Sequence, residues 1–540
     1  MAVRTCDSPR HEQGTALPNS PTPPSSPFAM TGALARCRAI SRTLGQAGLY
    51  QPAQPTTESS ASTESAPAAI TWRVSPEPFW LTTTEADFFE VLGGHLHAFY
   101  RAVNQLYHAS RKGQQPAWVA RYFDQGKPDT VIDYGRMNRF KQQLPGIIRP
   151  DIIPAASPFS IGSAPPATGA GWAITELDAV PGGIGLTAAL ARAYADSGGD
   201  AGVIGQSSRL IGGPNGMVAG FAAMIRAAAD HLKPHDTSSS RELLLAIVVS
   251  EESRDYRPEM TWLTEALSDH GIQAVCLSPD AIRFTEQQLE CDVNGRSHRI
   301  DVLYRFFELF DLKNIPKAEL FLYAAKKGLV AMTPPPKTYL EEKLAFALLH
   351  HPALRSFWRG ALPSETLTAL LGMIPPTWIV DPAPLPPHAV IPWLEIEGEA
   401  VTGWEQVSRA SQKGRHLILK PSGFSPLAWG SRGVVVGHDL SQEAWAEAVQ
   451  QAVNGFAQTP YILQPFVSGR PYTMSYWEPS ADRLIEIQGR VRLSPYYFSS
   501  GDRIQLGGVL ATFCPMDKKL LHGMSEAILA PCAVRETTGA

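Results

Sequence analysis

Residues 417–437, LILKPSGFSPLAWGSRGVVVG, hold two short apolar segments on either side of a turn rich in Gly, Ser and Pro. Lys420 stands at the end of the first segment, and Arg432 stands just before the second. The apolar, β-branched segments predict two strands joined by a loop. Two interpretations fit this pattern: a hairpin with a solvated tip, or a loop whose lysine and backbone N–H groups hold the phosphates of a nucleotide.

The composition is that of an ordinary soluble protein of two to four domains, with 540 residues, 44% hydrophobic and 18% charged. A formal net charge of -4 without a long basic run argues against nucleic-acid or membrane-surface binding. The six cysteines form no C-x-x-C pair, which argues against a zinc site or a disulfide framework. We therefore expect a cytoplasmic protein.

Four segments differ in composition and pattern, and together they predict an α/β (α+β) fold. Residues 1–75 are rich in Pro, Ser and Thr and are expected to be a disordered tail. Residues 76–240 start with helical periodicity and run on through helix and loop to an acidic strand, GWAITELDAV, at 171–180. Residues 241–330 contain a strand, an amphipathic helix and a second strand, which predict a Rossmann-like β-α-β domain. Residues 331–540 alternate strands and helices and include the opening stretch.

A second polar position at the end of a strand lies 44 residues after Lys420, in YILQPFV. Gln464 would offer one polar contact beside the apolar Phe466 and Val467, and this arrangement suits the edge of an adenine ring. A Gln-Pro pair at a strand end is also common in ordinary loops. The segment supports a nucleotide site only in combination with other motifs.

Two acidic segments could hold a metal ion. Glu176 and Asp178 lie two residues apart on a predicted strand, so their side chains share one face, where like charges repel. A Mg²⁺ ion would remove that repulsion, and Asp151 could add a third carboxylate with Arg149 as a counter-charge or phosphate contact. The alternative is an exposed strand face with two solvated acids.

The same region contains Gly183-x-Gly185-x-x-Ala188 between a strand and a helix, which matches a dinucleotide fingerprint. Two acids precede this turn, so a pyrophosphate would land beside negative charge. We interpret the pattern as a turn that lets the backbone approach a substrate, and we keep an NAD-dependent oxidoreductase as an alternative. No P-loop motif and no protein-kinase motif set is present.

Arg490 and Arg492 share one face of a predicted strand in QGRVRLSPYYF. An arginine near a transferring phosphoryl group stabilises the charge that develops there. Salt bridges at the protein surface would explain the pair equally well.

Taken together, the motifs resemble the ATP-grasp superfamily, in particular its circularly permuted branch related to glutathionylspermidine synthase. The resemblance rests on R-P-D at 149–151, E-L-D at 176–178, E-K-L around Lys343, L-K-P around Lys420, the loop SGFSPLAWGSRG and L-Q-P-F around Gln464. As in that branch, the acidic motifs come early in the chain. Two departures stand out: Asp178 takes the place of the usual asparagine, and GSRG stands where a G-R-E-G-like run is common.

The resemblance implies an ATP- and Mg²⁺-dependent ligase that joins a small-molecule carboxylate to an amine through an acyl-phosphate. It assigns residues 76–240 and 331–540 to the ATP-grasp core and 241–330 to the domain that precedes it. The implied roles are magnesium ligation by Asp151, Glu176 and Asp178, ATP binding by Lys343, Lys420, Gln464, Phe466 and Val467, and catalysis by Arg492 and Arg149. The alternatives are an Mg-ATP-binding protein without catalysis and the NAD-dependent oxidoreductase. Neither the two substrates nor the oligomeric state follows from the sequence.

Overall fold

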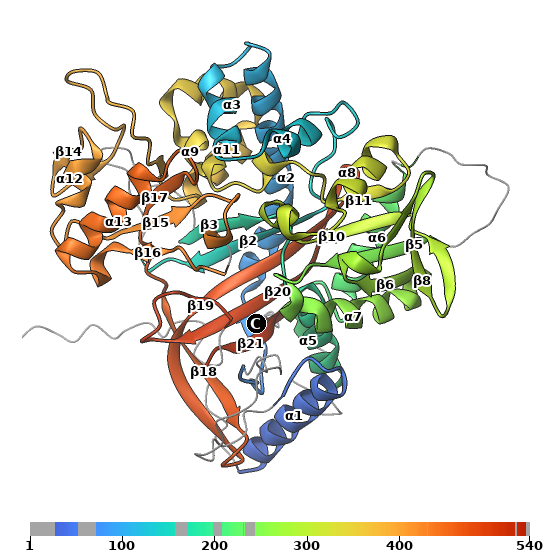
Figure 1. The fold of residues 1–540 in the computed structure, drawn as a ribbon. Helices are drawn as coiled ribbons and strands as arrows, with labels where there is room; N and C mark the ends of the chain where they lie inside the picture. Colours follow the sequence, from blue (N-terminus) through green and yellow to red (C-terminus); the bar gives the residue numbers. More distant parts are fainter. Residues whose placement is uncertain are drawn as a thin grey trace, which may run out of the picture.

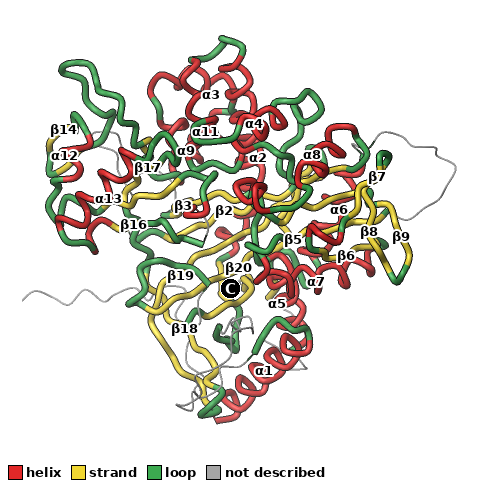
Figure 2. The backbone as a smooth tube through the Cα atoms, viewed as in Figure 1, coloured by secondary structure: helices red, strands yellow, loops and turns green. Residues whose placement is uncertain are grey.

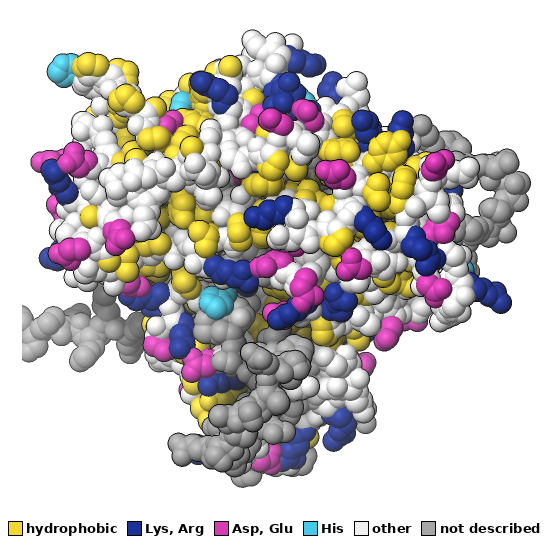
Figure 3. Space-filling model, in the orientation of Figure 1, with side chains coloured by type: hydrophobic (Ala, Val, Ile, Leu, Met, Phe, Trp, Pro, Cys, Tyr) yellow, Lys and Arg dark blue, Asp and Glu magenta, His cyan; other side chains and the backbone are white. Residues whose placement is uncertain are grey.

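A computed structural model describes residues 27–51, 72–156, 171–197, 208–230, 232, 243–428, 430–523 and 526–535. Three larger sheets and the helices around them build a mixed α/β fold (Figure 1). In the described part of the chain, no helix is both long enough and apolar enough to cross a membrane. On the face drawn in Figure 3, Lys and Arg side chains alternate with Asp and Glu and form no continuous basic band.

The largest sheet has eight strands, and it joins segments from both halves of the chain. Its order is β1-β21-β20-β19-β2-β3, with β18 beside β19 and β4 beside β21, and all pairs are antiparallel except β1 with β21. The strands are β1 (Phe79–Leu81), β2 (Ile147–Pro154), β3 (Trp172–Asp178), β4 (Ser208–Leu210), β18 (Pro471–Glu478), β19 (Arg483–Ser500), β20 (Arg503–Pro515) and β21 (Ile528–Arg535). β2 corrects the expectation of helix and loop: IIRPDIIP is apolar enough to lie buried between β19 and β3.

A four-stranded sheet contains the predicted β-α-β unit, β5 (Leu244–Val249), α7 (Arg257–Ala266) and β6 (Gln273–Leu277). Its order is β11-β10-β5-β6, and all its strands are parallel, with β10 (Val302–Phe306) and β11 (Ala331–Thr333) completing it. Every residue of β5 is buried, as the continuous run LLAIVV requires in a sheet covered on both faces. Beside it lie α8 (Ala318–Lys327) and a small sheet of β7 (Arg283–Thr285), β8 (Gln288–Val293) and β9 (Arg296–Arg299).

The opening stretch forms part of a second four-stranded sheet, which is antiparallel and ordered β12-β17-β15-β16. β15 (Leu417–Pro421) and β16 (Val435–Val436) pair as the predicted hairpin, and β12 (Trp378–Ile379) and β17 (Tyr461–Pro465) complete the sheet. The core of this part centres on Trp445, from α13 (Gln442–Asn454), which also packs on α12 (Trp404–Ser408). The hairpin β13 (Glu395–Ile396) and β14 (Glu399–Ala400) lies nearby (Figure 2).

The remaining helices cover one face of the large sheet and fill the space between the sheets (Figure 1). α2 begins with a complete capping box between Thr82 and Glu85, and it packs on β20 along a long apolar face. These helices are α2 (Thr83–Arg111), α3 (Ala117–Asp124), α4 (Asp129–Gly135), α5 (Ile184–Asp196), α6 (Gly216–Ala229), α9 (Leu344–His350), α10 (Arg355–Ala361) and α11 (Ser364–Met373).

The expectation of disorder is wrong for part of the tail. Residues 27–46 form helix α1, which packs on α5 through the fully buried Cys37, Ile40 and Leu44. An apolar stripe at helical spacing is enough to recruit this segment to the core, although Pro- and Ser-rich sequence surrounds it. The rest of residues 1–71, apart from 47–51, lies outside the described part of the chain.

If α1 is part of the folded core, Ile40→Ala should lower the free energy of unfolding by about 2–5 kcal/mol, because it leaves a cavity in a site with no exposure. Met30→Ala is the matched control in the same helix, since Met30 is 47% exposed. Urea unfolding followed by circular dichroism measures both. Equal stability of the two variants would show that α1 contributes nothing to the core.

Candidate active site

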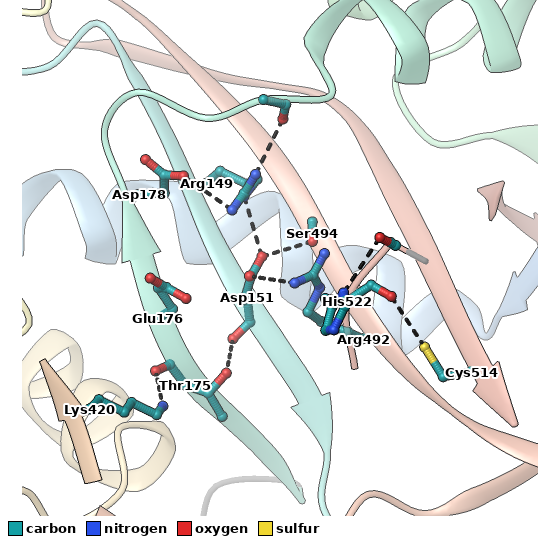
Figure 4. Close-up of polar contacts among 12 residues, drawn as sticks. Arg149, Asp151, Thr175, Glu176, Asp178, Lys420, Arg492, Ser494, Cys514 and His522 are labelled. Atoms are coloured by element: carbon teal, nitrogen blue, oxygen red, sulfur yellow. Dashed lines mark hydrogen bonds and ion pairs between the residues drawn. The ribbon is translucent and has the colours of Figure 1, made fainter. Parts of the chain in front are cut away.

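The pairing of β2 with β3 places four charged residues side by side. Asp151 lies opposite Glu176, and Arg149 lies opposite Asp178. Because residues two apart on a strand share a face, all four side chains belong to one patch of the sheet (Figure 4). The predicted acidic cluster is therefore real, and the arginine is built into it.

Asp151 is the most enclosed of the acids, with 3% exposure. Its Oδ1 accepts from Ser494 Oγ at 2.9 Å and faces Arg149 Nε at 3.3 Å, while Oδ2 pairs with Arg492 Nη1 at 3.0 Å (Figure 4). Burial opposes ionisation, but the two guanidinium groups outweigh it and hold the pKa of Asp151 below its usual value. Asp151 thus orients Arg492, the arginine favoured from the sequence. Arg490 instead donates to the carbonyl of Met516 at 3.0 Å.

The other two acids are paired with different cations. Lys343 Nζ lies 2.6 Å from Glu176 Oε1. Arg149 Nη2 lies 3.1 Å from Asp178 Oδ2, and Asp178 Oδ1 accepts the N–H of Val180. Burial lowers the pKa of Lys343, and Glu176 raises it by more, so this lysine stays protonated. Burial raises the pKa of the Asp178 carboxyl, against the pull of Arg149.

Lys420 links the hairpin sheet to the large sheet. It projects from β15 with 7% exposure, and its ammonium donates to the carbonyl of Thr175 at 2.8 Å (Figure 4). Burial lowers its pKa to about 8, because none of the described carboxylates forms an ion pair with it. Because this ammonium is buried, makes one hydrogen bond and has a reduced pKa, an anion that bound beside it would stabilise its charged form.

The loop after Lys420 is anchored at two points. The N–H of Gly423 donates to Glu342 Oε2 at 3.2 Å, and Glu342 is itself paired with Lys127 at 2.5 Å. A side chain at Gly423 would meet the carbonyl of Glu341 at 1.7 Å, so only glycine fits here. Further along, Arg432 Nη1 pairs with Glu252 at 2.7 Å, and this contact ties the loop to the segment after β5.

Gln464 lies on β17 next to the hairpin and is 1% exposed. Its amide Nε2 donates to Thr377 Oγ1 at 2.8 Å, so that nitrogen already has a partner. The N–H of Phe466 donates to the carbonyl of His416 at 2.9 Å, and the Phe466 ring lies 4.8 Å from that of His438.

The residues predicted from the sequence surround two adjoining cavities. A cavity of about 90 Å³ is lined by Asp151, Glu176, Lys343, Lys420, Gln464, Phe466, Val467 and Arg492. A neighbour of about 460 Å³ is lined by Arg149 and Asp178 and shares Asp151, Glu176, Lys343 and Arg492 with the first. All ten candidate residues are therefore brought together, although they come from six separate segments of the chain.

Sequence reasoning missed several lining residues. Ser494 stands two positions after Arg492, so the period of a strand could have placed it on the same face. Lys519 lines the smaller cavity from the segment after β20 and pairs with Asp439. Tyr256 lines the larger cavity, and no motif in the sequence marks it.

The donor set suits Mg²⁺ in its chemistry, since all three acids are carboxylates. Within the described residues, however, no group of three or more His, Cys, Asp or Glu side chains is arranged to hold a metal ion. Each carboxylate is instead held by a lysine or an arginine. Glu176 and Asp178, at 34% and 25% side-chain exposure, are the accessible donors, and magnesium ligation by Asp151, Glu176 and Asp178 stays a prediction.

The glycine-rich turn before α5 is filled from within the protein. Glu259 of α7 accepts the N–H of Gly183 at 2.7 Å and that of Leu186 at 2.9 Å, which are the donors that a pyrophosphate would need. A side chain at Gly185 would meet the carbonyl of Glu259 at 2.1 Å. The preceding strand, β3, pairs antiparallel with β2, whereas a dinucleotide fold needs parallel strands. The dinucleotide alternative is therefore wrong.

Comparisons with known proteins give one informative likeness. No protein-family model and no curated protein sequence matches the chain. Among solved structures, an apo glutathione synthetase-like effector from Globodera pallida matches over 96% of this chain and 99% of its own, with a TM-score of 0.52 and 10% identity. D-alanyl-alanine synthetase A from Vibrio cholerae matches over 54% of this chain and 88% of its own, with a TM-score of 0.24 and 9% identity, too low to carry an argument.

At 10% identity, the first likeness shows the fold and nothing more. The chain shares the mixed α/β fold of that effector along nearly its whole length.

Lys420→Met should stabilise the free protein near pH 7 by up to about 3 kcal/mol, because it removes a buried ammonium whose folded pKa of about 8 lies below its ordinary 10.5. The unfolded chain binds more protons between these two values, so the stability of the unsubstituted protein rises with pH across this window. The advantage of the variant should therefore shrink from pH 8 to pH 10. Urea unfolding at several pH values measures this, and a constant difference would contradict it.

Proposed function

We propose that the protein is an ATP- and magnesium-dependent carboxylate–amine ligase that works through an acyl-phosphate, as glutathionylspermidine synthase-like enzymes do. One observation carries this proposal: Lys343, Lys420 and Arg492 converge on the same cavity as Asp151 and Glu176. Cations and carboxylates from separate sheets meet where a nucleotide's phosphates and a metal ion would need them together.

The two lysines and the hairpin loop form the proposed phosphate site. The ammonium groups of Lys420 and Lys343 would bind the phosphates, and the weak partnering of Lys420 leaves it free to exchange a carbonyl for a phosphate oxygen. Phe466 and Val467 would pack against the adenine, and Gln464 would contact its edge through the carbonyl oxygen, since the amide nitrogen is held by Thr377. The loop from Ser422 to Gly433 would exclude water from the acyl-phosphate.

In the proposed reaction, an oxygen of the substrate carboxylate attacks the γ-phosphorus of ATP, the bond to the β-phosphate oxygen breaks, and ADP leaves. The amine nitrogen then attacks the acyl carbon, phosphate leaves, and the nitrogen loses a proton to give the amide. Arg492, held in place by Asp151, would stabilise the negative charge on the transferred phosphoryl group. Arg149 is positioned between Asp151 and Asp178 to support the same charge.

Glu176, Asp178 and Asp151 are the side chains that would hold Mg²⁺ together with the phosphates of ATP. When bound, Mg²⁺ neutralises phosphate charge.

A protein that binds Mg-ATP without catalysis is the second candidate, favoured by the ion pairs that engage every acid of the site. The two candidates differ in turnover alone. The permuted order of the chain, the four-domain division and a cytoplasmic location also remain proposals, and so do the two substrates.

Calorimetric titration with Mg²⁺ and a non-hydrolysable ATP analogue should show binding that Lys420→Ala and Glu176→Ala each weaken by about tenfold or more, because each removes a charge from the cavity. ADP release from ATP should depend on adding both a carboxylate and an amine, drawn from panels of small peptides and of amino acids, ammonia and polyamines. Lys420→Ala should abolish that release.

Lys413→Ala is the matched control, since Lys413 is exposed and lies shortly before the same strand. Undiminished nucleotide binding by both Lys420→Ala and Glu176→Ala would refute the site. Nucleotide binding that requires Lys420, with no ADP release for any pair in the panels, would favour the non-catalytic candidate.

A further inference from the structure

A third cavity, separate from the proposed nucleotide site, is lined by an unusual number of aromatic and proline side chains. Its volume is about 530 Å³, within the range of small-molecule sites. It lies between the end of α9, strand β12 and the segment 381–404. Its lining includes Tyr122, Trp378, Trp393, Trp404 and Asp381.

Tyr122, Trp378 and Trp404 already use their polar atoms in hydrogen bonds within the protein. Trp378 Nε1 donates to the carbonyl of Pro392 at 2.8 Å, and Trp404 Nε1 donates to the carbonyl of Asp381 at 2.6 Å. Tyr122 OH donates to Asp381 Oδ2 at 2.5 Å. What the indoles of Trp378 and Trp404 still offer to a ligand is therefore their apolar ring surface, and these hydrogen bonds fix the rings in position.

Asp381 is the one carboxylate in the lining of this cavity. Besides Tyr122 OH it accepts the N–H of Ala383 at 2.8 Å through Oδ1, so the side chain is oriented by two neutral donors. Among the described residues that line the cavity, none is Lys or Arg, and none besides Asp381 carries a carboxylate. A ligand that displaced water from this carboxylate would leave a charge without a counter-charge unless the ligand were a cation.

The two histidines in the lining do not supply that positive charge. Burial lowers the pKa of His350 to about 4, and its Nε2 lies 3.1 Å from the carbonyl of Ile374. Burial also lowers the pKa of His351, whose Nδ1 accepts the N–H of Ala353 at 3.2 Å. Both imidazoles are neutral near pH 7, so the lining carries a single negative charge.

Trp393 adds an independent sign that this region is built to present aromatic surface. Its φ of 58° lies in the left-handed region, where a bulky side chain is strained. Such strain concentrates at ligand-binding segments. The guanidinium carbon of Arg355 lies 4.7 Å from the centre of the Trp393 ring, so this ring already takes part in one cation–π contact.

From the single carboxylate, the aromatic lining and the volume, we propose that this cavity binds a small organic cation: an ammonium group carried on a compact apolar or aromatic body. The cation would face Asp381, and its body would pack on the tryptophan rings. Thr377 lines this cavity and also holds Gln464 of the smaller cavity, so the two sites share one wall and are otherwise distinct.

The test is calorimetric titration of the full chain with three probes of similar shape: benzyltrimethylammonium, the neutral benzyl alcohol and the anionic phenylacetate. A quaternary ammonium is chosen because it has no lone pair and cannot serve as the amine of a ligase. We expect the cation to bind at millimolar concentration or tighter, and at least about fivefold more tightly than either other probe. Equal or tighter binding of benzyl alcohol or phenylacetate would overturn the proposal. The absence of cation binding at concentrations up to about 10 mM would also overturn it.

Two variants locate the binding. Asp381→Asn should weaken binding of the cation about tenfold and leave benzyl alcohol within about twofold. Trp393→Gly removes the ring, and glycine suits the left-handed backbone at this position. This variant should also weaken cation binding several-fold, and it keeps the test valid if Asp381→Asn does not fold. Asp502→Asn, at a carboxylate whose side chain is 93% exposed, is the matched control. Lys420→Met should leave cation binding unchanged, which separates this proposal from the nucleotide site. Unchanged cation binding in both cavity variants would refute it.

Discussion

The rest of the site depends on the charge balance where β2 pairs with β3. This pairing puts Asp151 opposite Glu176 and Arg149 opposite Asp178 inside the protein, where one arginine cannot neutralise three acids. Removing a charge from water without compensation costs several kcal/mol, so further cations have to arrive from elsewhere. They are Arg492, from the neighbouring β19, and Lys343, from the segment before α9. The docking of these segments on the large sheet is therefore an electrostatic requirement as much as a packing result.

Lys420 completes this arrangement in a different way. It reaches the backbone of β3 from the hairpin sheet, and no acid meets it directly, so burial reduces its pKa. The hairpin is thus held to the large sheet at a contact that is costly in the free protein. A phosphate would both supply the missing counter-charge and use the lysine's remaining donors. The hairpin and the proposed phosphate clamp do not exclude each other: β15 and β16 pair as an ordinary hairpin, and the loop between them lines the cavity.

The sequence predicted those helices and strands whose hydrophobic pattern is complete within a short stretch of the chain. The run LLAIVV, the amphipathic helix after it and the strand at 273–277 identified the β-α-β unit, and the strand carrying Glu176 and Asp178 was recognised from its alternation. IIRPDIIP was missed as a strand because it has no alternation and contains a proline in its interior. Only its burial between β19 and β3 explains it, and that is a tertiary effect. The packing of helix α1 on the core was not predicted for the opposite reason: the composition around it concealed a short apolar stripe.

The candidate residues could be found from sequence, but their partners could not. Gly183 and Gly185 show why. A glycine pattern between a strand and a helix states only that the backbone must turn tightly and that something approaches it closely. Two different occupants satisfy this requirement: a pyrophosphate on the helix N-terminus, or a carboxylate of the protein itself. Glu259 lies 74 positions after Gly185, in helix α7 beside another sheet. Nothing in the sequence near the glycines indicates that this carboxylate is their partner. Glu259 accepts the N–H of Gly183, and the carbonyl of the adjacent Gly182 accepts from Arg149 and Tyr496, so a residue behind the cavity lining helps to set the position of the arginine within it.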